Sequence, residues 1–69
     1  MKAERVGEIL ETVKAIRAEI EADVKAAVDA GKGHNQVAGA LSMVGAWLLY
    51  AEGNLTSLHK AIAASKREV

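Results

Sequence analysis

The sequence predicts an all-α protein, an antiparallel two-helix hairpin that assembles into a homo-oligomeric bundle, most simply a dimer with four helices. Two long segments without proline repeat apolar residues at steps of three and four, a spacing that places side chains on one side of a helix. One glycine-containing segment, 30–35, separates them, and so short a connection makes the helices antiparallel neighbours. We expect helices at about residues 2–31 and 34–67, within a single domain, residues 1–69.

The first segment carries an apolar series that is interrupted once. Its members follow at steps of three and four: Val6, Ile9, Val13, Ile16 and Ile20. Asp23 occupies the next position of the series, and the apolar residues resume at Val24, which predicts a local change of helix phase near Asp23. The charged residues at the remaining positions are typical of a solvated face: Glu4, Glu8, Glu11, Lys14, Arg17 and Glu19.

The connecting segment has the residues of a capped turn. Gly31 suits the left-handed position after a helix, and Asn35, or Gly33 before it, suits the N-cap of the next helix. A second interpretation makes Lys32, His34 and Asn35 an anion-binding site at that helix N-terminus. The Walker A spacing is absent, however, and no predicted strand precedes the turn.

The second segment is apolar on two sides. Residues 37–51 contain no charge, and Trp47 is the only tryptophan of the chain. We expect one stripe to form the oligomer core, joined by Ala51: Leu41, Val44, Leu48, Leu55, Leu58 and Ile62. Met43, Trp47 and Tyr50 form a second stripe, and the first helix can cover only one of the two. The sequence therefore predicts self-association. We expect the glycines of this segment, at positions 39, 45 and 53, to allow close approach of a neighbouring backbone.

Composition argues against several classes of function. Nine basic and nine acidic residues leave no net charge, so we expect no binding to nucleic acid or to an anionic membrane. The chain has no cysteine, and its two histidines lie far apart, so we expect no metal, no cofactor, no catalytic residues and no enzyme activity. The uncharged run is shorter than the roughly 20 residues of a spanning helix. The charged N-terminus is unlike a signal peptide, which indicates a cytoplasmic protein.

Four large side chains of the second segment are the candidate binding residues for a partner protein: Met43, Trp47, Leu49 and Tyr50. Tryptophan and tyrosine contribute much of the binding energy at protein interfaces. The alternative makes Met43, Trp47 and Tyr50 the self-association core, with the Tyr50 hydroxyl at its rim. Leu49 points away from both predicted stripes, so we expect it to remain accessible in an oligomer, with Tyr50 next.

The layout of the second segment resembles small phage-encoded helical-hairpin antagonists. The resemblance rests on short matches: His34-Asn35 after a glycine, Ala40-Leu41, Trp47-Leu48 followed by Ala51, and the basic end Lys66-Arg67. One group of such proteins blocks a host quorum-sensing activator, and another sequesters cyclic-nucleotide signals of antiviral defence. The resemblance implies a homo-oligomer that inhibits or adapts a host protein. The alternative is a sponge that holds an anionic ligand, such as a signalling nucleotide, between subunits.

Overall fold

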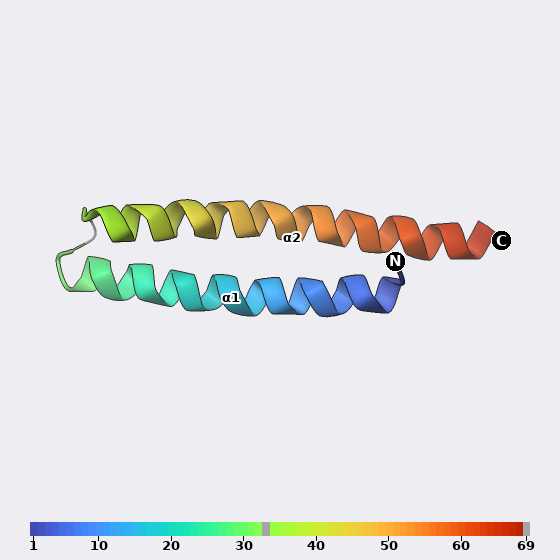
Figure 1. Ribbon diagram of the computed structural model, residues 1–69, viewed down its shortest axis with the longest axis horizontal. Coiled ribbons are helices and arrows are strands. Elements are labelled where there is room, and N and C mark those ends of the chain that lie inside the picture. Colours follow the sequence, from blue (N-terminus) through green and yellow to red (C-terminus); the bar gives the residue numbers. More distant parts are fainter. Residues whose placement is uncertain (33, 69) are drawn as a thin grey trace.

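The computed structural model contains two antiparallel helices that pack against each other along their length (Figure 1). It describes residues 1–32 and 34–68, and side chains as far as residue 65. Helix α1 spans Ala3–Asp29 and helix α2 spans Gln36–Glu68, so the predicted hairpin is confirmed. The predicted helices begin one and two residues too early, and the first ends two residues too late. The hairpin is a rod of 55 × 14 × 14 Å, with α2 reaching past the start of α1 (Figure 1).

Gly31 ends α1 in the conformation that the sequence predicts. Its φ of 75° lies in the left-handed region, and its N–H donates to the carbonyl of Val28 at 3.0 Å. The N–H of Lys32 donates to the carbonyl of Ala27 at 2.7 Å. These two bonds form a Schellman motif, which satisfies carbonyl groups at the end of the helix and turns the chain back.

Asn35 is the N-cap of α2. Its side-chain oxygen accepts a 2.7 Å hydrogen bond from the N–H of Ala38, and its carbonyl accepts the first helical bond, from Gly39. The other predicted cap, Gly33, lies outside the described residues, as do the side chains of Lys66 and Arg67.

The surface of α1 that faces α2 is one continuous stripe, so the predicted phase change near Asp23 is wrong. Its positions alternate at three and four residues throughout, and their side chains are buried or half-buried: Ala3, Val6, Leu10, Val13, Arg17, Ile20, Val24 and Ala27. Arg17 occupies a contact position that the sequence analysis assigned to solvent. The exposed Ile16 and Asp23 belong to a neighbouring stripe, so the contact stripe continues through this region without a one-residue shift.

The matching stripe of α2 contains only part of the predicted core. Its members are buried or half-buried: Ala38, Leu41, Gly45, Leu48, Glu52, Leu55, His59 and Ile62. The predicted core residues Val44 and Leu58 are exposed in the hairpin. Because the four residues at positions 41, 48, 55 and 62 fit both stripes, apolar periodicity could not tell which stripe faces α1.

One glycine of α2 lies in the contact with α1, where its neighbour is a side chain and not the expected backbone. A Cβ on Gly45 would lie 3.7 Å from Cγ2 of Ile20, so α1 packs directly over this position. Gly39 and Gly53 are exposed with no atom within 4 Å of such a Cβ, so the expected close approach does not occur there within the chain. A Cβ on Gly7 of α1 would lie 4.0 Å from Cδ2 of His59, which is an ordinary contact distance.

The two contact stripes leave an unusually large surface outside. The hairpin exposes 5178 Å², whereas a compact monomer of this mass exposes roughly 4,200 Å². Its radius of gyration is 15.9 Å, compared with about 11 Å for a compact chain of this length. Val6 is fully buried, but most large apolar residues of α2 keep substantial exposure.

Replacing Gly31 by alanine should destabilise the hairpin by about 1–2 kcal/mol, because an L-residue is strained at positive φ. The matched change Gly39→Ala should instead stabilise it by up to about 1 kcal/mol, since the site is helical, exposed and open. Urea titration followed by circular dichroism measures both values. Equal effects of the two substitutions would contradict the assignment of Gly31 as the helix stop.

Candidate functional site

A charged group crosses the middle of the helix contact. The guanidinium of Arg17 donates through Nε to Glu52, and its Nη2 lies 3.1 Å from the second carboxylate oxygen. The Arg17 Nη1 also donates to Glu21 at 2.6 Å. The Glu52 side chain is 9% exposed and that of Arg17 is 24% exposed, so this is a partly buried bidentate pair.

Hydrogen bonding to Glu52, and then to Glu21, raises the pKa of Arg17 above its ordinary value, so the guanidinium remains charged. The pair therefore places a charged guanidinium at a contact position of the two helices. A pair of this kind at one level of an otherwise apolar contact favours a single register of the two helices. We assign it a structural role. Apolar periodicity does not identify either residue, because both are charged, although opposite charges at facing positions are a signal for register.

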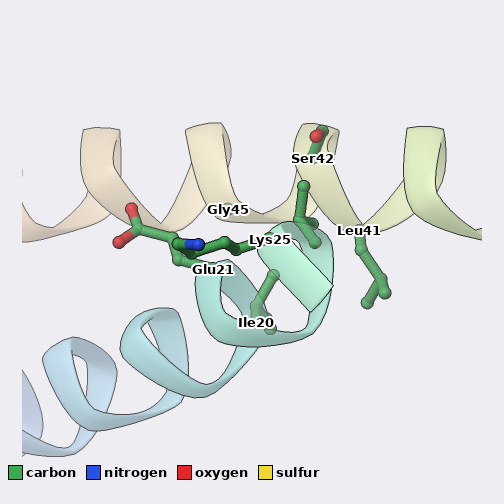
Figure 2. Close-up of a pocket in the computed structure, with 7 residues that line it drawn as sticks. Ile20, Glu21, Lys25, Leu41, Ser42 and Gly45 are labelled. Atoms are coloured by element: carbon green, nitrogen blue, oxygen red, sulfur yellow. The ribbon is translucent and has the colours of Figure 1, made fainter. Parts of the chain in front are cut away.

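An open groove of about 330 Å³ lies beside this pair, on the side of Glu21 (Figure 2). Its lining comes from both helices: Ile20, Glu21, Val24, Lys25, Leu41, Ser42 and Gly45. The absent side chain of Gly45 helps to open it, and Figure 2 shows Leu41 reaching from α2 towards α1.

The charged residues of the groove are already paired. Glu21 binds Arg17, and Lys25 binds Asp29 at 2.8 Å. Ile20, Val24 and Leu41 supply its apolar surface. The groove therefore fits an apolar side chain better than a charged ligand, which would have to replace those ion pairs.

The groove defines the two sides of the rod. On α1, Glu21 lies on one side of the contact stripe and Ile16 on the other, because each residue advances a helix by about 100°. On α2, the same stepping places Ser42 on the groove side and Trp47 on the opposite side. Since Glu21 and Ser42 line the same groove, Ile16 and Trp47 share the other side.

We call this other side the Trp47 face. It consists of Ile9 and Ile16 from α1 with Val37, Val44, Trp47, Ala51 and Leu58 from α2. Trp47 is 65% exposed, and Val37 and Ile16 are also exposed. A patch of this kind, drawn from both helices of a small protein, is typical of an interaction surface. The predicted core residues Val44 and Leu58 belong to it and not to the contact within the chain.

The four candidate partner-binding residues separate onto three parts of the surface. Leu49 is 56% exposed and lies on the groove side, two helical turns beyond Ser42. Trp47 lies on the opposite face. Met43 and Tyr50, the latter 75% exposed, point away from α1. Only Leu49 therefore lies on the same side as the groove, and we call this combined surface the Leu49 face.

The anion site at the turn stays a prediction. Lys32 and His34 are exposed. The side-chain oxygen of Asn35 accepts a hydrogen bond from the N–H of Ala38, so this side chain caps the helix.

Comparisons with protein-family models, with curated proteins and with solved structures find no match to this chain. Among the described residues, no helix is long and apolar enough to cross a membrane. Over the same part of the chain, no three His, Cys, Asp or Glu side chains gather as metal ligands would. The Trp47 face and the Leu49 face are therefore the candidate functional surfaces.

Replacing Arg17 by leucine should lower the melting temperature, because Glu52 would then be buried without its partner. Glu52→Leu should also lower the melting temperature, because Arg17 would then lose its partner on α2. The double variant should recover or exceed the original stability, since a buried ion pair is often replaced by apolar residues without loss. Thermal melts of the original protein, the two single variants and the double variant form a double-mutant cycle. Additive losses would show that the two residues do not act as a pair.

Proposed function

We propose that the protein is a small homodimeric interaction protein that binds a host or regulatory protein and acts as an inhibitor or adaptor, without catalysis. The Trp47 face supports self-association. Its exposed residues are large and apolar, and they come from both helices. Two hairpins joined by these faces would form a four-helix bundle with α2 shielded on two sides.

The exposed area supports a dimer quantitatively. The hairpin exposes 5178 Å², about 1,000 Å² more than a compact chain of its mass. A standard protein interface covers about 800 Å² on each partner. One such interface would remove most of the excess, and the Trp47 face supplies apolar residues for it.

The Leu49 face supports a separate contact with a partner protein. Dimerisation through the Trp47 face leaves Leu49 and the groove outside, because they lie on the opposite side of the rod. The apolar groove can receive a side chain of another protein, and the exposed leucine beside it can contact the same partner. Twofold symmetry would present this surface twice. The resemblance to helical-hairpin antagonists agrees with such a role.

Changing Trp47 to glutamate should weaken dimerisation by at least about 30-fold, since a central aromatic residue of an interface contributes about 2 kcal/mol or more. Helix content should stay the same, because this side chain is 65% exposed in the single hairpin. Leu49→Glu is the matched control, with the same charge change at a similarly exposed position on the other side. Light scattering after size exclusion measures the mass. A monomeric original protein, or equal effects of the two variants, would contradict the proposed dimer.

Leu49→Ala should weaken capture of the partner from a lysate of the native host, with dimer and helix content unchanged. Tyr50→Ala is the control and should have a smaller effect, since this exposed residue lies outside both the Leu49 face and the Trp47 face. Quantitative mass spectrometry of the captured proteins gives the ratio for each variant. A melting temperature raised by nucleotides, with no protein lost from the Leu49→Ala sample, would favour the ligand-sponge alternative instead.

A further inference from the structure

We propose that the second copy binds the Trp47 face in one orientation, antiparallel and with α1 against α1, so that the two turns lie at opposite ends of the dimer. The proposal rests on the dimerisation proposed above and specifies its geometry. It follows from a stripe of α1 that the contact with α2 leaves exposed or half-exposed: Lys2, Arg5, Ile9, Thr12, Ile16, Glu19 and Asp23. These residues recur at alternating steps of three and four, so they lie along one line of the helix.

The order of basic, apolar and acidic side chains makes this stripe complementary to a second copy that runs in the opposite direction. It begins with two cations, continues with Ile9, Thr12 and Ile16, and ends with two acids. Placed antiparallel about Thr12, two copies bring basic ends against acidic ends. Lys2 then faces Asp23 of the partner subunit, Arg5 faces Glu19 of the partner subunit, and Ile9 faces Ile16 of the partner subunit.

The acidic members of the stripe have no partner within the described chain. Neither Glu19 nor Asp23 takes part in an ion pair there. Arg5 contacts only Glu8, at 3.0 Å, and both side chains are about two-thirds exposed. An exposed pair of that kind is weak, so Arg5 is able to turn to a partner.

The reverse arrangement, with both turns at one end, would place α1 against α2 of the second copy. At the level of Glu19 and Asp23, α2 carries no charge, because residues 36–51 have none. The two acids would then lie against an uncharged, apolar helix and lose hydration without gaining a partner.

The packing of α2 is compatible with this centre. Gly7 lies near His59, and Ile20 lies over Gly45, so the level of Thr12 corresponds to about Asn54 on α2. Around that level, Trp47 faces Ala61 of the partner subunit, a large side chain against a small one. Asn54 lies near its own copy on the twofold axis.

Charge reversal tests the pairing. Arg5→Glu alone and Glu19→Arg alone should each weaken dimerisation about 3- to 10-fold, because each creates two like-charge contacts per dimer. The double variant should return to within about twofold of the original affinity. Glu11→Arg, on the groove side of α1, is the control and should change little. Sedimentation equilibrium measures the dissociation constants. Failure of the double variant to recover would overturn the pairing.

Cysteine crosslinking tests the orientation independently, because the chain has no cysteine of its own. Under mild oxidation, Thr12→Cys should form a disulfide-linked dimer, since the twofold places this residue beside its own copy. Lys32→Cys at the turn should not, because the two turns would be roughly 50 Å apart at 1.5 Å per helical residue. The opposite result would show the turns together and overturn the orientation while leaving the dimer intact. A monomer in light scattering would overturn both the dimer and its orientation.

Discussion

Two helices can shield each other along only one stripe each, and the form of this protein follows from that limit. Helix α1 covers a single line of α2, so the chain becomes a thin rod with few buried side chains. The large apolar residues of α2 outside this line are exposed, including Trp47. A chain of this size without cysteine has few ways to stabilise such a fold alone. In the dimer that we propose, the exposed Trp47 face supplies the burial that a single hairpin lacks.

The composition of the shielded stripe decides how the helices meet. Gly45 and Ala38 are small, buried residues of the contact, and Ile20 packs against the first of these. Arg17 and Glu52 place a bidentate ion pair among apolar neighbours. A sliding register would leave both charges unpaired in a partly buried site, which is costly. The stripe thus gives up some apolar burial in exchange for one defined alignment of the two helices.

That alignment places the remaining apolar surface on opposite sides of the rod. Val44, Trp47 and Leu58 lie with Ile16 on one side, and the groove lies with Leu49 on the other. Because the sides are opposite, self-association and binding of a partner protein do not compete in the arrangement that we propose. The charges of α1 add direction to self-association, since cations and acids occupy opposite ends of one exposed stripe.

The sequence by itself determined the hairpin, the stop at Gly31 and the cap at Asn35, because these depend on local chemistry and on a spacing of three and four. The same spacing predicted that α2 is apolar on more than one side. It could not decide which of two overlapping stripes faces α1, because residues such as Leu41 and Leu48 belong to both. Hydrophobicity favoured the stripe with Val44 and Leu58. The tertiary structure uses the one with Gly45 and Glu52, since helix contact depends on close approach and on the charge of Arg17 opposite, and these are properties of two facing surfaces.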